Sequence, residues 1–175
     1  MDIDPSAARH LEDFTPGQRF MSSERYRLDP ARTKAFAAEY DPQPFHLDEH
    51  AAEASMFRGL AASGWLTAAV TMRLLVRSEL RPAGGVLGAG IDELRWLRPV
   101  RLDDELRIES EVVEVGAPHP GRQLGVLRVR VVTFNQNDEP VMSSIASLRV
   151  PTRDPVVATD VSAHGVRAIE PSNRD

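Results

Sequence analysis

Cysteine is absent from the 175-residue chain. Disulfides, thiolate nucleophiles and zinc sites with cysteine ligands are therefore excluded. No apolar run approaches the ~20 residues that a membrane-spanning helix requires, because polar residues interrupt the longest run, at 65–75. The N-terminal stretch MDIDPSAARHLEDF is acidic and lacks the apolar core of a signal peptide. We therefore expect a cytoplasmic protein with no membrane partner.

A net positive charge is also lacking, since 21 Lys and Arg residues stand against 26 Asp and Glu residues and the net charge is −5. Nucleic-acid binding needs a basic face opposite the phosphates, so this charge argues against a nucleic-acid partner. Hydrophobic residues make up 42% of the chain and charged residues 27%, which is ordinary for a globular protein. The length predicts one domain, residues 16–150, between an N-terminal arm, residues 1–15, and a C-terminal tail, residues 151–175.

Helix signals fill the first half of this domain. The Asp-Pro pair at 29–30 is typical of a helix start, and Pro42 disfavours helical geometry at the residue before it, so a helix is expected between them. A shorter helix is expected after Asp48. The longest helix is predicted over WLTAAVTMRLLVRSEL, residues 65–80, where apolar residues cover most of the circumference. Such a helix is buried on nearly all sides, by a curled sheet or at a subunit interface.

Strand signals dominate the second half. Residues 86–100, 104–115, 123–136 and 139–150 are rich in Val, Ile and Leu with much period-two alternation, and residues 19–28 can add a short strand. The polar stretch NQND predicts a hairpin turn between the last two segments. Helices segregated to one side of an antiparallel sheet make an α+β fold. A sheet wrapped around a long central helix is the hot-dog fold.

The stretch YDPQPFHLDEHAA places Asp41 and His46 five residues apart in a proline-stiffened loop. A carboxylate and an imidazole on one stiff loop can bind a water, orient it and move its proton. Pro42 and Pro44 each fix a φ angle, and an extended bend between the two side chains can bring them together. Taken alone, the same residues are more often a polar helix end and an ordinary loop histidine.

A second candidate is the start of the long helix, Ser63-Gly64-Trp65. Amides in a first helical turn lack intrahelical partners, and Gly64 has no side chain to keep a ligand oxygen away from its N–H. A carbonyl oxygen that gains charge during a reaction is held well by such a group. The alternative is that Ser63 only caps the helix and that Gly64 only eases packing.

The combination resembles a known family, the MaoC-like dehydratases. DPQPFH, followed by LDEHAA and GLAASG, is similar to the family signature D-x-N-P-φ-H, in which φ is apolar, and to the glycine that opens the central helix. The resemblance extends from FTPGQRF, which begins at residue 14, to PVRLDDEL at 99–106. The matching residues are Asp41, Pro44, Phe45, His46 and Gly64.

Two positions depart from the family pattern. Gln43 stands where the signature has Asn, and Ser63 stands where a His usually precedes the glycine. The string ASGW looks like a sub-branch of the family, so we interpret both departures as changes of substrate rather than as loss of activity.

The resemblance implies an (R)-specific enoyl-CoA hydratase, or 3-hydroxyacyl-CoA dehydratase in the reverse direction, that needs neither metal nor cofactor. Asp41 and His46 would activate a water that adds to the β-carbon of an acyl-CoA thioester, while the Gly64 N–H steadies the thioester oxygen. Substrate-binding candidates are Phe45, Ser63, Trp65 and Arg58, with Met56 as a further wall residue and Arg95, Arg98 and Arg101 as further cations for the coenzyme A phosphates.

Two other functions stay open at this point. A thioesterase on the same fold would direct the water at the carbonyl carbon, and a non-catalytic acyl-binding subunit would not use the pair at all. A single hot-dog unit exposes a sheet edge and one side of its helix, so we also expect at least a homodimer.

Overall fold

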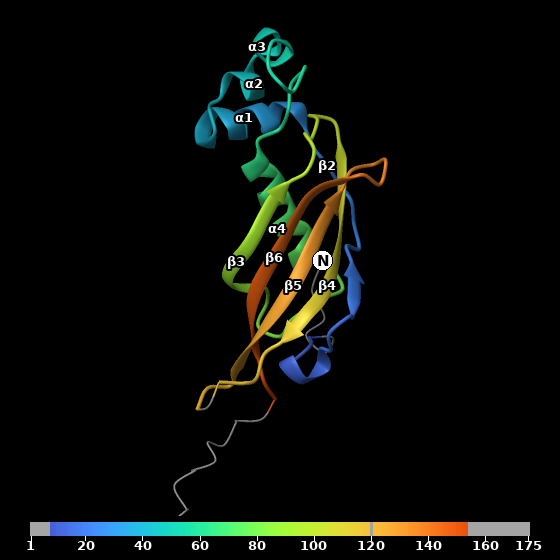
Figure 1. Cartoon of the computed structure of the whole chain (residues 1–175), viewed down its shortest axis with the longest axis vertical. Coiled ribbons are helices and arrows are strands. Elements are labelled where there is room, and N and C mark those ends of the chain that lie inside the picture. The colour runs from blue at the N-terminus through green and yellow to red at the C-terminus, as the bar shows by residue number, and fades with distance from the viewer. Residues whose placement is uncertain (1–7, 120, 154–175) are drawn as a thin grey trace, which may run out of the picture.

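The computed structural model describes residues 8–119 and 121–153 (Figure 1). Residues 1–7 of the predicted N-terminal arm and residues 154–175 of the predicted C-terminal tail lie outside the described residues. The described chain opens with a short 3-10 helix, η2 (Leu11–Asp13), in which Leu11 is buried in the core. The division of the chain into arm, domain and tail stays a prediction.

The helices precede the four long strands, as the sequence predicts. They are α1 (Pro30–Tyr40), α2 (Pro44–Leu47), α3 (Glu49–Glu53) and α4 (Gly64–Val76). α1 begins at the predicted cap, because the Asp29 carboxylate accepts a hydrogen bond from the Arg32 amide. α4 ends four residues before the predicted end at 80, and the Ser78 hydroxyl then donates to the Leu75 carbonyl oxygen.

α2 corrects the prediction of an extended loop around His46. Pro44 is the first residue of a helical turn, and the His46 amide donates to the Gln43 carbonyl oxygen at 2.9 Å. The fixed φ of proline suits a first helical position, and its missing N–H would have no partner there in any case. The extended backbone of Gln43 separates this turn from α1, so the two helices can present side chains to a common space.

The strands pair antiparallel throughout the described chain and form one six-stranded sheet, with β1, β4, β5, β6 and β3 in order and β2 beside β4. The hairpin turn predicted at 135–138 joins β5 and β6. Residues 19–28 form two short strands rather than one. The strands are β1 (Arg19–Met21), β2 (Tyr26–Arg27), β3 (Leu87–Trp96), β4 (Glu105–Val115), β5 (Leu124–Phe134) and β6 (Pro140–Pro151).

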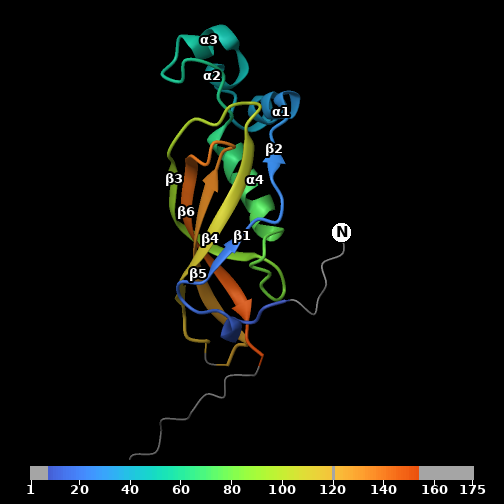
Figure 2. The same ribbon diagram turned by 90° about the vertical axis from the view of Figure 1, so that its right-hand side faces the viewer.

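α4 lies against one face of this sheet, and α1 to α3 gather beyond the end at which α4 begins (Figure 2). Its inward face buries Val70, Leu74 and Leu75 against the alternate, inward-facing residues of the strands. One polar contact crosses this packing, where the Thr71 and Thr133 hydroxyl oxygens lie 2.7 Å apart. The predicted α+β hot-dog fold, a sheet curled around a central helix, is confirmed.

The outward face of α4 is not covered by the sheet of its own chain, so of the two predicted ways to bury this helix on nearly all sides, the subunit interface stays a prediction. Met72 and Val76 are 41% and 44% exposed. The edge strand β3 is exposed almost throughout, including Leu87 and Ile91. No helix in the described ranges combines the length and apolar character of a membrane span.

Candidate active site

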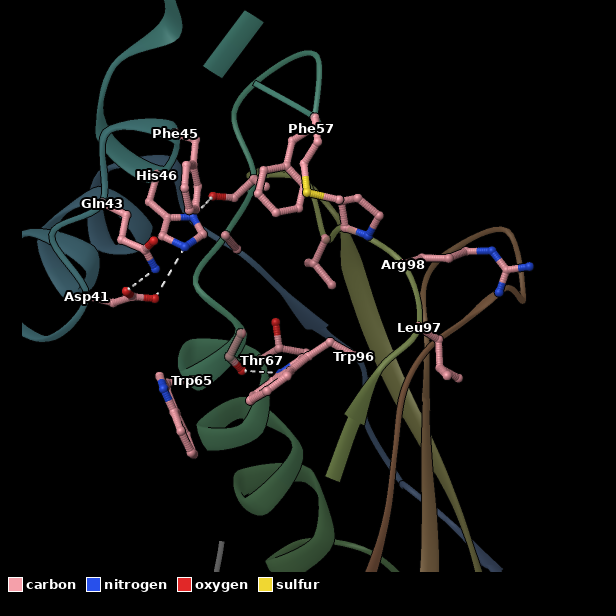
Figure 3. Close-up of a pocket in the computed structure, with 16 residues that line it drawn as sticks. Asp41, Gln43, Phe45, His46, Phe57, Trp65, Thr67, Trp96, Leu97 and Arg98 are labelled. Carbon is pink, nitrogen blue, oxygen red and sulfur yellow. Dashed lines mark hydrogen bonds and ion pairs between the residues drawn. The ribbon is translucent and has the colours of Figure 1, made fainter. Parts of the chain in front are cut away.

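A pocket of about 610 Å³ opens where α1, α2 and the first turn of α4 meet (Figure 3). Asp41, Gln43 and His46 line one side of it, and Gly64 and Thr67 of α4 line another. The remaining lining residues, apolar apart from Arg98, are Phe45, Met56, Phe57, Ala61, Ala62, Trp65, Trp96, Leu97, Arg98, Pro99 and Val100.

Asp41 stands at the C-terminal end of α1, where Pro42 stops the helix, and its side chain is only 15% exposed. The carboxylate accepts hydrogen bonds at both oxygens. Gln43 Nε2 donates to Oδ1 at 2.8 Å, and Ser63 Oγ donates to Oδ2 at 2.6 Å. The longer amide at position 43 therefore still reaches the carboxylate.

His46 projects from α2 toward the same carboxylate, and its Nε2 lies 3.2 Å from Asp41 Oδ2 (Figure 3). Its other ring nitrogen, Nδ1, lies 2.7 Å from the Ala61 carbonyl oxygen. A carbonyl oxygen can only accept, so Nδ1 carries a hydrogen. Nε2 faces a carboxylate oxygen, so the contact is favourable when one proton is held between Nε2 and Oδ2. The two side chains thus behave as one coupled unit.

The pKa of the Asp41 carboxyl lies below its ordinary value of 3.8. Burial raises this pKa, but the hydrogen bonds from Ser63 and Gln43 and the charge of His46 together outweigh burial. An ionised Asp41 can accept three hydrogen bonds and still offer a lone pair to a water in the pocket. The pair is therefore equipped to remove a proton from water.

Ser63 is fully buried and is not among the pocket-lining residues. Its Oγ accepts from the Trp65 amide at 3.2 Å, which caps α4, and it donates its own hydrogen to Asp41. The hydroxyl is thus directed at a carboxylate rather than at an imidazole that could deprotonate it. This geometry is not that of a serine nucleophile.

Gly64 is the first residue of α4, and within the described residues its N–H donates no hydrogen bond. The Trp96 indole lies directly against this glycine, because Nε1 donates to the Gly64 carbonyl oxygen at 2.9 Å. A Cβ at position 64 would come within 2.7 Å of the indole. The absence of a side chain therefore has a packing reason as well as leaving the amide open.

Aromatic rings form much of the pocket wall. Phe45 contacts Phe57 with 5.0 Å between ring centroids and meets the His46 ring edge to face at 4.6 Å. Trp65, which is 58% exposed, meets Trp96 edge to face at the rim. Phe45 and Trp65, which are substrate-binding candidates from the sequence, therefore both line the pocket. Met56 also lines the pocket, although it is 88% exposed.

Sequence reasoning missed Phe57, Trp96 and Leu97 as lining residues. Trp96 ends the edge strand β3 and reaches a glycine 32 positions earlier in the chain. No spacing rule links those positions. The available signal is composition, because Trp96 is one of only two tryptophans in the chain.

The predicted cations are dispersed. Arg58 is exposed, has a φ of 49° and does not line the pocket. Arg101 donates to the carbonyl oxygens of Phe57, Gly59 and Leu60, so it holds the loop that carries Phe57. Arg98 does line the pocket, although its guanidinium donates to the Pro140 carbonyl oxygen. Arg95 pairs with Glu93. Among the described residues, no three His, Asp or Glu side chains gather as a metal site.

Residues 12–134 match the model of the MaoC like domain. The chain is 32% identical over 141 residues to the uncharacterized protein YdeM of Bacillus subtilis, covering 80% of this chain and 97% of the relative. Among solved structures, it is similar to a MaoC-like dehydratase from Rhodospirillum rubrum, with 48% identity, a TM-score of 0.79 and coverage of 84% and 99% of the two chains. It is also similar to the R-hydratase PhaJ1 from Pseudomonas aeruginosa, with 28% identity, a TM-score of 0.62 and coverage of 82% and 86%.

Proposed function

The chain belongs to the MaoC-like dehydratase family, and we propose that it is an (R)-specific enoyl-CoA hydratase that also runs as a 3-hydroxyacyl-CoA dehydratase. The observation that carries the proposal is the coupled pair of Asp41 and His46, whose Oδ2 and Nε2 lie 3.2 Å apart, in a largely apolar pocket that Gly64 also lines. Likeness to an R-hydratase structure supports it.

The proposed reaction uses the pair as both base and acid. As the oxygen of a bound water forms its bond to the β-carbon, a proton of that water passes to the pair, and the electrons of the carbon–carbon double bond shift toward the thioester. A proton of the pair then passes to the α-carbon, so the pair ends with the protons with which it began. General acid–base catalysis of this kind contributes on the order of 10²–10⁴ in rate.

The Gly64 amide has a separate task in this reaction. Negative charge gathers on the thioester oxygen while the β-carbon is attacked, because the intermediate has enolate character. An N–H at the start of α4, favoured by the helix dipole, stabilises that charge more than it stabilises the neutral substrate. The Ser63 cap fixes the turn to which this amide belongs.

The direct test is the loss of enoyl absorbance when the protein is mixed with crotonyl-CoA. We expect loss with a 3-hydroxyacyl product in the wild type, and none in Asp41→Asn or His46→Ala proteins that remain folded. Release of free coenzyme A with an intact double bond would instead indicate a thioesterase. Absence of any reaction across enoyl thioesters of short, long and branched chains would leave only acyl binding and would overturn the proposal.

We propose further that the working form is at least a homodimer. β3 ends the sheet of the described residues with an unpaired edge, and exposed apolar side chains occur on β3, at Leu87 and Ile91, and on the outward face of α4, at Met72 and Val76. Native proteins cover such an edge or pair it with another chain. Light scattering should give a particle of at least twice the chain mass, and Ile91→Lys should reduce that mass, whereas Val126→Lys on the central strand β5 should not.

A further inference from the structure

We propose that Ser63 is a positioning residue that joins the base to the helix start, holding the Asp41 carboxylate ionised and aimed at the pocket from the same turn that presents the Gly64 amide. This inference rests on the proposed hydratase function for its catalytic consequence. The contacts of the serine do not depend on that function.

The first support is the double use of one hydroxyl group. Ser63 Oγ accepts from the Trp65 amide, and its single hydrogen is thereby left for Asp41 Oδ2, at 2.6 Å. An accepting contact to a backbone N–H fixes the oxygen, so the direction of the donated hydrogen is also fixed. The carboxylate is thus held by the N-cap residue of the helix that begins at the pocket.

The second support is the position of Ser63 behind the pocket rather than in it. Ser63 is fully buried and does not line the pocket, whereas Asp41 and Trp65, the two residues that its hydroxyl contacts, do. A group in this place cannot contact an acyl chain directly. It acts through Asp41, and its removal should change the turnover of bound substrate more than the binding of substrate.

The charged groups around Asp41 do not replace the hydrogen bond that Ser63 donates to it. The imidazole of His46 faces the carboxylate from α2. On α1, Lys34 pairs with Glu49 of α3, 3.7 Å away, rather than with Asp41. The first turn of α4 contains no acidic residue, and Arg98 across the pocket is turned to Pro140. Ser63 and Gln43 are therefore the neutral donors that favour the ionised carboxylate.

The test compares Ser63→Ala with Ser63→Thr, which keeps a hydroxyl. A hydrogen bond to a charged group is strong enough to shift a carboxyl pKa by about one unit. In Ser63→Ala we expect the acid limb of the kcat/KM profile for crotonyl-CoA to move up by about one pH unit, kcat to fall about tenfold, and KM to change less than about twofold. Ser63→Thr should restore the profile.

Loss of a helix cap alone must be separated from this effect. Asp29→Ala is the matched control, because Asp29 caps α1 through the Arg32 amide at 2.8 Å and lies at the opposite end of that helix from Asp41. Both alanine variants should lower the melting temperature, but only Ser63→Ala should move the acid limb. Equal effects of the two variants on the profile, or no shift in Ser63→Ala, would overturn the proposal.

A measurement without substrate keeps the inference independent of the reaction. The ¹³C carboxyl resonance of Asp41, followed against pH, should titrate about one pH unit higher in Ser63→Ala than in the wild type. If the wild type proves inactive on every enoyl thioester, the proposed function fails, and this titration still decides the role of Ser63. An unchanged titration would show that the serine only caps the helix.

Discussion

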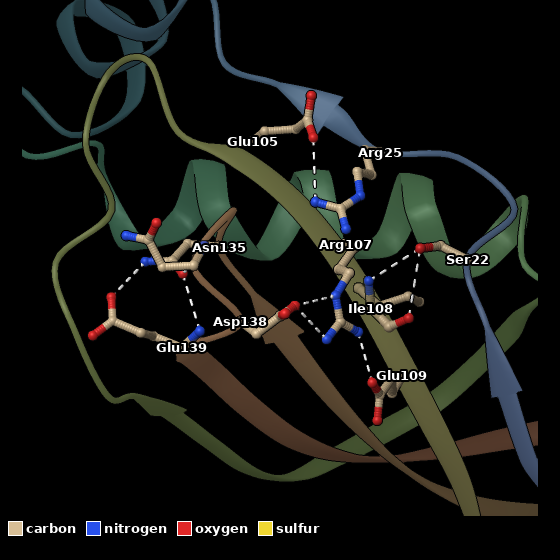
Figure 4. Close-up of polar contacts among 10 residues, drawn as sticks. Ser22, Arg25, Glu105, Arg107, Ile108, Glu109, Asn135, Asp138 and Glu139 are labelled. Atoms are coloured by element: carbon tan, nitrogen blue, oxygen red, sulfur yellow. Dashed lines mark hydrogen bonds and ion pairs between the residues drawn. The ribbon is translucent and has the colours of Figure 1, made fainter.

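Two clusters of ionisable side chains in this protein are each built around one shielded residue, but they differ in what they can do. Arg107 on β4 is 15% exposed, as is Asp41. The Arg107 guanidinium contacts Glu109 at 2.6 Å and Asp138 at 2.8 Å (Figure 4). It also lies over the Phe134 ring. The burial of the central residue therefore does not distinguish the two clusters, although Glu109 and Asp138 are 42% and 68% exposed and His46 is only 6% exposed.

The difference lies in the protons. Burial lowers the pKa of Arg107, but the hydrogen bonds to Glu109 and Asp138 raise it by more than burial lowers it. The guanidinium therefore stays charged. Nε2 of His46 and Oδ2 of Asp41 lie 3.2 Å apart, close enough to hold one proton between groups that can exchange it, and the pair borders an apolar pocket. A mobile proton next to a ligand space is what makes the second cluster a candidate for catalysis.

The largest expected effect concerns the aspartates of the two clusters, Asp41 and Asp138. Asp41→Asn should lower kcat/KM for crotonyl-CoA by about a thousandfold, because the amide cannot accept a proton from water. Asp138→Asn, the matched change in the Arg107 cluster, should leave kcat/KM within about twofold. Steady-state assays on both folded variants check this, and a comparable loss in Asp138→Asn would contradict the distinction.

The next effect concerns the open amide beside the pair. A methyl group at position 64 would clash with the Trp96 indole, so Gly64→Ala should lower kcat/KM by roughly a hundredfold through displacement of the first turn. Adding Trp96→Ala removes that clash and should recover about tenfold of the loss. The assay is again crotonyl-CoA hydration.

Recovery in the double variant separates the two uses of the glycine. If the double variant stays as inactive as Gly64→Ala alone, the indole contact is irrelevant and the methyl group acts only by keeping substrate from the amide. A circular dichroism spectrum of each variant controls for loss of α4.

A smaller effect is expected when the Arg107 cluster is changed, and it concerns stability rather than activity. Arg107→Met should lower the free energy of unfolding by about 1–2 kcal/mol, because it removes a partly buried ion pair and the contact with the Phe134 ring. Urea unfolding measures the change, and hydratase activity in the folded variant should be unaffected. A folded but inactive Arg107→Met protein would assign this cluster a part in the reaction.

The smallest expected effect is the pH dependence of the unfolding free energy that comes from Asp41. The pKa of Asp41 is lower in the folded protein than its ordinary value of 3.8, so its ionisation stabilises the fold above about pH 4. That contribution is lost as pH falls through the folded-state pKa. The difference in unfolding free energy between wild type and Asp41→Asn should therefore shrink from pH 6 to pH 3, as measured by urea unfolding, and a constant difference would contradict it.

The sequence predicts local elements well because their signals are local. The Asp29 cap, the Pro42 stop and the alternation of Leu106, Ile108 and Val112 each act within a few residues, and the structure has the corresponding helix and strand. The turn at Pro44 was missed because a proline both stiffens a loop and opens a helix, and position alone does not decide between them.

The prediction of the site is limited by contacts between distant segments. The motif brings Asp41, His46 and Gly64 to one pocket, but the contribution of Trp96 depends on sheet register, and that of Ser63 on the direction of one hydrogen. The four arginines show the same limit. Their charge is visible in the sequence, whereas the carbonyl groups that engage Arg98 and Arg101 are not.

The hydroxyl pair of Thr71 and Thr133 has a consequence for how the central helix is seated. A roll of α4 about its own axis would move its buried residues Val70, Leu74 and Leu75 away from the sheet. A roll would part the two buried hydroxyls, which lie 2.7 Å apart, and leave them without each other. The contact between Thr71 and Thr133 therefore helps to fix the rotation of α4 about its own axis. It thereby also fixes the direction of the Gly64 N–H, which lies two turns away.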